Sequence, residues 1–292
     1  MKKFLNKKKI IIIIPLYNDW ISAIKLIKKI KRLKINNVFI QILIINDFSK
    51  NINYFLNQKK SRLVTGLKII NLKKNFGHDR AIIIGMFYLL KKKVKFDYAI
   101  TMDSDGEDNP KYLSKIINVS IKNPQKIIVC TRKKRENSLY FKFLYYSHLS
   151  ILFLFTFKWM NHGGYNSINK ENINLLLNHK NIWGNYSAVI ETINIKKEYI
   201  ITNRSKRFDG TSKTNFFKLL MHSFSIMSVF KKKIIFTSFI YISVLNIFFI
   251  KSYNFYNIFF LIFPFFFLLS LRESRDWKRF VFKNISYLKK IF

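Results

Sequence analysis

The chain has 292 residues, enough for one large α/β domain with an appendage, and its 49% hydrophobic and 17% aromatic content excludes global disorder. A single cysteine, Cys130, excludes a disulfide framework and cysteine-based zinc or iron–sulfur sites. Lysine and arginine outnumber aspartate and glutamate by 53 to 15, a formal net charge of +38. We ascribe most of this excess to A/T-rich codon usage and solvated helix faces, and the rest to attraction for anionic lipids or phosphate substrates, because no nucleic-acid-binding motif accompanies it.

Strands and helices alternate over the first half of the chain. The first strand is a β-branched run over residues 10–14; it is too short for a signal peptide, and no small-residue cleavage site follows. Periodicity then predicts helices over 21–33, 81–90 and 110–121, and strands over 38–45, 67–72, 98–102 and 126–130. This alternation predicts an α/β fold with a mostly parallel sheet and helices on both faces.

The second half is more apolar. Residues 139–160 are rich in tyrosine, phenylalanine and leucine, and they form either an amphipathic helix at a membrane interface or a core helix. Residues 234–250 and 255–271 carry no charged side chain and have the length of short membrane-spanning helices. Basic residues flank this pair, which places both flanks on the cytoplasmic side. A pair of buried soluble helices is the alternative.

Polar side chains follow three of the predicted strands, at residues 17–19, 46–47 and 103–105. Because ligands of parallel sheets bind outside the carboxyl ends of the strands, we expect the site at this edge.

Acidic residues are scarce, and four of the fifteen lie within six positions: Asp103, Asp105, Glu107 and Asp108. Crowded carboxylates repel one another unless a cation neutralises them, and hard oxygen ligands suit Mg²⁺ or Mn²⁺ bridging a diphosphate. An EF-hand loop is excluded because Asp108 stands where glycine is needed and Ser114 where glutamate is needed. A solvated acidic turn before Pro110 is the other alternative.

Six ordered motifs between residues 10 and 213 carry a family resemblance. They are Pro15-Leu-Tyr-Asn-Asp19, Ile45-Asn-Asp-Phe-Ser49, Asn75-Phe-Gly-His78 with Ala81 and Gly85, Met102-Asp-Ser-Asp-Gly-Glu-Asp-Asn-Pro110, Thr131-Arg-Lys-Lys-Arg135 and Arg207-Phe-Asp-Gly-Thr-Ser-Lys213. The set resembles family 2 glycosyltransferases with the GT-A fold, in the membrane-anchored branch of dolichyl-phosphate mannose synthase and bacterial polyprenyl-phosphate glycosyltransferases. A metal-dependent, inverting hexosyltransferase is what this resemblance implies.

The resemblance also implies roles for individual residues. The nucleotide would be held by Pro15, Tyr17, Asn18, Asp19, Asp47, Asn75 and Gly77. The sugar diphosphate and its Mg²⁺ or Mn²⁺ would be held by Asp103 and Asp105, with Glu107 as an added metal ligand. The acceptor phosphate or leaving diphosphate would contact Arg132, Arg135, Arg207 and Lys213, because guanidinium forks match phosphate oxygens. His78 and His162 show no metal-ligand spacing, and we assign them no role.

Several positions depart from the family pattern. Asn46, Phe48 and Asn51 replace the usual Asp, Gly and Asp, and Gly164 stands where many relatives have an aspartate. A phosphate monoester is largely dianionic at neutral pH and needs no base, whereas a sugar hydroxyl normally needs one. The missing aspartate therefore favours a polyprenyl (undecaprenyl-type) phosphate acceptor for a UDP- or GDP-sugar. The alternatives are transfer to a hydroxyl of a lipid-linked glycan, or a degraded, non-catalytic nucleotide-sugar-binding protein.

The expected organisation follows from these predictions. Residues 1–213 form the GT-A catalytic domain, 214–233 a juxtamembrane amphipathic segment, 234–271 two transmembrane helices and 272–292 a basic cytoplasmic tail. This predicts a multi-pass protein of the inner membrane with its catalytic domain in the cytoplasm and membrane lipids as partners. A homo-oligomer is compatible with such an anchor, although neither apolar stretch has a G-x-x-x-G motif.

Overall fold

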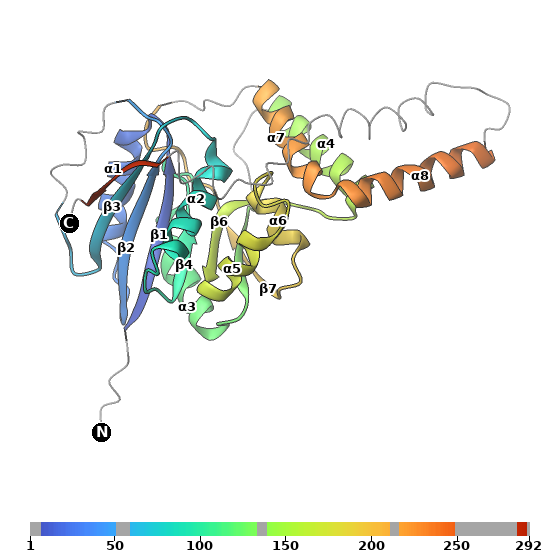
Figure 1. Cartoon of the computed structure of the whole chain (residues 1–292). Coiled ribbons are helices and arrows are strands. Elements are labelled where there is room, and N and C mark those ends of the chain that lie inside the picture. The colour runs from blue at the N-terminus through green and yellow to red at the C-terminus, as the bar shows by residue number, and fades with distance from the viewer. Residues whose placement is uncertain (1–6, 51–58, 133–138, 211–215, 249–284, 291–292) are drawn as a thin grey trace.

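The computed structural model describes residues 7–50, 59–132, 139–210, 216–248 and 285–290 (Figure 1). The strands are β1 (Lys8–Leu16), β2 (Val38–Asn46), β3 (Val64–Leu72), β4 (Tyr98–Thr101), β5 (Ile127–Arg132), β6 (His162–Asn169), β7 (Lys197–Thr202) and β8 (Ile285–Lys290). The α-helices are α1 (Trp20–Lys31), α2 (His78–Lys91), α3 (Leu113–Lys122), α4 (Leu139–Thr156), α5 (Lys170–Asn178), α6 (Tyr186–Thr192), α7 (Phe216–Val229) and α8 (Lys231–Phe248).

The strands form one eight-stranded sheet in the order β7-β5-β6-β4-β1-β2-β3-β8. Strands β1 to β4 are parallel where they pair, as the sequence predicts. Strand β6 runs antiparallel between β4 and β5, and β8 runs antiparallel to β3 at the edge. The sheet is therefore mixed. The sequence patterns predict neither of these two antiparallel strands.

Both faces of the sheet are covered, which confirms the predicted layers. Alternate residues of a strand point to opposite faces. Ile10, Ile12 and Ile14 accordingly pack in one core with α1 and α3, while Ile11 and Ile13 pack in the other with α2, α5 and α6. The β-branched run of β1 is therefore buried on both sides.

The predicted helix over 110–121 is two elements. A 3₁₀ turn, η2 (Pro110–Tyr112), precedes α3, and the side chain of Asn109 caps it by accepting a hydrogen bond from the Lys111 N–H at 3.0 Å.

Helices α4, α7 and α8 group together beyond one end of the sheet, and α8 extends away from it (Figure 1). Helix α4 packs in the core through Leu152 and Phe155, whereas Phe143 and Phe153 are exposed, and its predicted place at a membrane interface stays a prediction. None of the helices in the described part of the chain combines the length and apolar character needed to cross a membrane. The predicted span over 234–250 falls largely in α8, and the span over 255–271 lies outside the described residues.

Candidate active site

The carboxyl ends of β1, β2 and β4 meet at one edge, as predicted, and hydrogen bonds between loops hold this edge together. The Asn18 N–H donates to Ser49 Oγ at 2.8 Å. The buried Asp47 carboxylate accepts the N–H groups of Phe76 and Gly77 at 2.7 and 2.8 Å. In this structure Asp47 therefore fixes the loop before α2. Pro15 is buried in β1, and Tyr17 and Asn75 are exposed beside this edge.

The acidic segment after β4 folds on itself. The Asp103 N–H donates to Asp108 Oδ2 at 3.0 Å, and the Glu107 N–H donates to Asp105 Oδ1 at 2.9 Å. Gly106 between them has a φ of 85°, a conformation that favours glycine. The tight turn holds Asp103, Asp105 and Glu107 near one another.

Residues 203–210, which we call the arginine strap, lie across this acidic turn. Backbone N–H groups of Ser205 and Phe208 donate to the carbonyls of Glu107 and Asp105, both at 2.9 Å. The Arg207 guanidinium then bridges two strand ends: Nη1 is 2.7 Å from Asp105 Oδ2, and Nη2 is 2.8 Å from Asp19 Oδ2.

Other basic side chains face the remaining carboxylates. Arg204 forms an ion pair with Glu107. His78 Nε2 lies 2.6 Å from Asp103 Oδ1. Arg132, at the end of β5, lies directly against Gly163, where an added Cβ would overlap its guanidinium. Asp103, Asp105 and Glu107 thus each have a basic partner, whereas Asp108 accepts a backbone N–H.

The proximity of the acids shifts their pKa values. Burial and the neighbouring charges of Asp103 and Glu107 raise the pKa of Asp105 to about 7, despite Arg207. Burial and Asp103 similarly raise the pKa of Asp108 to about 6. Burial also acts on Asp103, but His78 outweighs it and lowers the pKa of Asp103 well below its usual value. The acid turn, residues 103–108, therefore carries more negative charge than its basic neighbours neutralise, and a bound cation would stabilise it.

This chemistry fits a divalent cation. Within the described ranges no three histidine, cysteine, aspartate or glutamate side chains are gathered closely enough to hold a metal ion on their own. Asp103 and Asp105 would hold Mg²⁺ or Mn²⁺ together with phosphate oxygens of a donor, since such metals keep several non-protein ligands. Glu107 as a further ligand stays a prediction, because it is paired with Arg204 here.

The structure brings together most of the predicted site. Asp19, Asp103, Asp105, Glu107 and Arg207 lie in one cluster, with Arg132 beside it. Arg135 and Lys213 lie outside the described residues. Sequence reasoning missed Arg204 and His78. The one available signal was position, because Arg204 is three residues before Arg207 and His78 directly follows the motif glycine Gly77.

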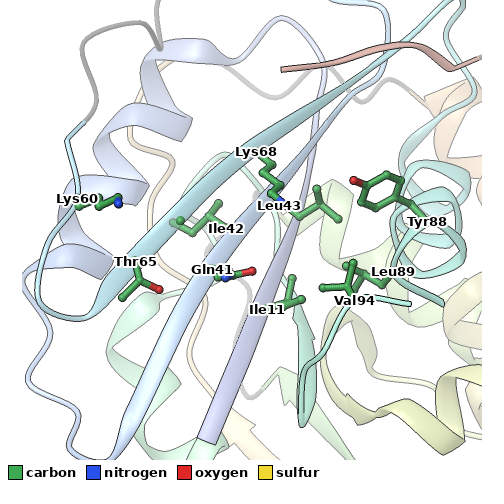
Figure 2. A pocket seen from close by; sticks show the side chains of 11 residues that line it. Ile11, Gln41, Ile42, Leu43, Lys60, Thr65, Lys68, Tyr88, Leu89 and Val94 are labelled. Carbon is green, nitrogen blue, oxygen red and sulfur yellow. The ribbon is translucent and has the colours of Figure 1, made fainter. Parts of the chain in front are cut away.

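A hollow of about 190 Å³ lies elsewhere, near the amino ends of β1 to β3 (Figure 2). Polar side chains of Gln41, Thr65, Lys68 and Tyr88 line it together with apolar ones such as Ile11, Leu43 and Val94. No carboxylate lines it, so it offers no ligands for a divalent cation. The acidic edge is therefore the candidate active site.

A mixed sheet of this order, with acids at the carboxyl ends of its strands, defines a GT-A domain. Residues 11–194 match the family model Glycosyl transferase family 2, and the chain belongs to this family. Two Bacillus subtilis (strain 168) proteins are similar in sequence. Uncharacterized glycosyltransferase YkcC is 26% identical, over 45% of this chain and 39% of its own length. Uncharacterized glycosyltransferase YkoT is 25% identical, over 65% of this chain and 56% of its own length. The matches thus span about half the length of these relatives or less.

The fold also matches a solved structure. Glucosyl-3-phosphoglycerate synthase from Mycobacterium tuberculosis, in complex with Mn²⁺, UDP-glucose and phosphoglyceric acid, superposes with a TM-score of 0.52 at 10% identity, covering 78% of this chain and 80% of that chain. At this identity the match shows the shared GT-A fold.

Gly106 offers a direct test of the strap. A Cβ there would overlap the ring of Phe208, and the backbone is already in the left-handed region. We expect Gly106→Ala to displace the strap and to weaken binding of UDP or GDP with Mn²⁺ at least tenfold, with a stability loss of about 2 kcal/mol. Gly210→Ala is the matched control, because Gly210 has a φ of 68° but open space around it. Equal effects of the two variants on nucleotide binding, measured by calorimetry, would contradict the strap's role.

Proposed function

We propose that the chain transfers a sugar from a UDP- or GDP-sugar to a polyprenyl phosphate. The observation that carries this proposal is the convergence of Asp19 and Asp105 from two strand ends on the Arg207 guanidinium, with Asp103 in the same turn as Asp105. Carboxylates beside forked cations suit a ligand that is a metal-bound diphosphate joined to a nucleoside.

In the proposed reaction, an acceptor phosphate oxygen attacks the anomeric carbon of the sugar. The bond between that carbon and the diphosphate oxygen breaks, the nucleoside diphosphate leaves, and the configuration inverts. A divalent cation, when bound, would stabilise the negative charge of the leaving diphosphate. Arg207, freed from Asp105 by the incoming cation, would bind the phosphate oxygens, and Arg132 would hold the acceptor phosphate.

A phosphate acceptor is inferred because residue 164 has no carboxylate side chain. Gly164 has no carboxylate to remove a proton from a hydroxyl. A phosphate needs no such base because it is already ionised at neutral pH. Arg132 lies against the neighbouring Gly163, and its pKa is raised by Asp108 and Asp103 although burial opposes the charge. It is therefore a permanent cation next to the acid turn.

The lipid part of the proposal rests on the helices beyond the sheet. Phe143 of α4 is 71% exposed and Phe236 of α8 is 65% exposed, with Phe239 beside it. Lys231 to Lys233 precede this apolar face. Exposed aromatic residues next to basic ones suit a surface of anionic lipid. Strand β8 pairs with β3, so residues 285–290 lie in the catalytic sheet. The proposed hairpin over 234–271 at the inner membrane would begin and end on one side, which is compatible with this pairing.

Vesicle binding tests this face. We expect the double variant Phe236→Glu and Phe239→Glu to weaken binding to phosphatidylcholine–phosphatidylglycerol vesicles at least tenfold, because two exposed apolar side chains that would enter the lipid become charged. Ile121→Glu is the control, since Ile121 is an exposed apolar residue on α3. Co-sedimentation measures both. Unchanged binding of the double variant would remove the lipid-facing assignment.

The activity itself is tested with purified chain, Mn²⁺, undecaprenyl phosphate and radiolabelled UDP- and GDP-sugars. The proposal expects a lipid product that releases its sugar in mild acid, as glycosyl phosphates do. An acid-resistant product on a lipid-linked glycan would identify a hydroxyl acceptor. Nucleotide-sugar binding without turnover would identify a non-catalytic protein.

A further inference from the structure

The imidazole of His78 lies in the space toward which a side chain at residue 164 would point. A Cβ on Gly164 would lie 3.1 Å from His78 Cε1 and 3.3 Å from Ile82 Cδ1. This is tighter than ordinary van der Waals contact, so glycine at 164 gives the ring its place. An aspartate there would compete with the ring for the same space.

Two carboxylates contact the two nitrogens of the same ring. Nε2 is 2.6 Å from Asp103 Oδ1, and Nδ1 is 3.5 Å from Asp79 Oδ1. Asp79 is itself held by Asn185, whose Nδ2 donates to Asp79 Oδ2 at 2.9 Å. The ring is therefore held by Asp103 and by Asp79, which Asn185 at the N-cap of α6 supports, and it packs against β6 at Gly164.

Asp103 depends on this ring for its orientation. Among the described side chains, His78 is the one that forms a hydrogen bond with the Asp103 carboxylate. The bond occupies Oδ1 and leaves Oδ2 directed elsewhere. The terminal torsion of an aspartate is broad, so a single strong hydrogen bond decides which way the second oxygen faces.

We propose that His78 is a positioning residue that orients Asp103 toward the nucleotide-sugar, and that Gly164 is needed to seat it. This inference rests on the proposed function, in which Asp103 contacts the donor. It explains the glycine at 164 as the counterpart of the histidine at 78, so that the departure from the family pattern is not a loss of function.

A double-mutant cycle tests the pairing. We expect His78→Ala and Gly164→Ala each to weaken binding of UDP or GDP in the presence of Mn²⁺ roughly tenfold, measured by calorimetry. In the His78→Ala background, Gly164→Ala should have no further effect, because no ring is left to displace. His78→Gln should restore part of the affinity, since its amide N–H can donate to Asp103. Additive losses in the double variant, or full affinity in His78→Ala, would overturn the proposal.

A second readout needs neither nucleotide nor turnover. In the free protein labelled with ¹⁵N-histidine, the Nε2 proton of His78 should give a far-downfield resonance, as a proton in a short charge-assisted hydrogen bond does. Asp103→Asn should abolish it and Gly164→Ala should shift or abolish it. If this signal behaves as expected and nucleotide binding depends on His78 while no sugar is transferred, the proposed transfer fails but the orientation of Asp103 by His78 for nucleotide binding stands. A wild-type spectrum without it, or a signal that Gly164→Ala leaves unchanged, would overturn the positioning role.

Discussion

Asp105→Asn is expected to abolish transfer while making the protein more stable. Asp105 is 8% exposed and lies beside Asp103 and Glu107, so its charge is unfavourable in the folded state until a cation binds. Asparagine removes that charge and also removes a metal ligand. We expect a loss of transfer of roughly 10³-fold, because leaving-group stabilisation by a metal contributes several kcal/mol.

The gain in stability should depend on pH. The folded pKa of Asp105 is about 7, above the unfolded value, so the folded state holds the proton more tightly than the unfolded state. The wild type therefore loses stability as pH rises from about 4 to 7, and the penalty is complete above 7. At pH 8 we expect Asp105→Asn to gain on the order of 2 kcal/mol, about 4 °C in Tm, and near pH 4 almost nothing.

Thermal unfolding at the two pH values, together with the transfer assay, measures both effects. Asp97→Asn is the matched control, because Asp97 forms a half-exposed pair with Lys8 away from the acid turn. That variant should retain transfer and show no gain at pH 8. Undiminished transfer by Asp105→Asn would remove Asp105 from the metal site.

Arg207→Ala is expected to have the opposite effect on stability and a similar effect on transfer. The guanidinium bridges Asp19 and Asp105, and all three side chains are less than one-fifth exposed. Its removal leaves two carboxylates facing each other without a cation. Breaking a buried pair of this kind costs about 3 kcal/mol, and we expect transfer to fall at least 100-fold.

Two conditions should reduce the cost of Arg207→Ala. At pH 5.5 Asp105 is protonated, which removes one of the facing charges. Millimolar Mn²⁺ at pH 8 should also recover part of the lost Tm, because the metal replaces the missing cation. Arg207→Lys is the conservative control; its single ammonium cannot bond both carboxylates as a fork does, so we expect an intermediate loss. A variant with unchanged Tm and no response to Mn²⁺ would show that the bridge does not stabilise the cluster.

The central strands and helices are predictable because their signal is local. The isoleucine run of β1 is apolar at every position, as a strand buried on both faces must be, and α1 and α3 repeat apolar residues every three to four positions. Strand β6 was missed because His162–Asn169 is polar and rich in glycine, with no alternation to reveal it. Its antiparallel pairing with β4 and β5 comes from those neighbours and not from its own side chains.

The acids of the site are also predictable, since four carboxylates within six positions are rare in so basic a chain. Their partners are not. Arg207 and Asp19 are 188 positions apart, and nothing in either local sequence links them. His78 appeared to be a lone histidine without metal-ligand spacing, and only its distance to Asp103 assigns it a place in the site.

Local sequence patterns predict the order of the central strands and helices, the edge of the sheet that carries the acids, and the family. These depend on periodicity and on residues that are close along the chain. Only the folded structure shows which cation faces which carboxylate, what an added Cβ would meet at residues 106 and 164, and where the strap lies. Those features depend on distances of a few ångströms between segments that only folding brings together. At such distances a small displacement changes the Coulomb and steric energies steeply.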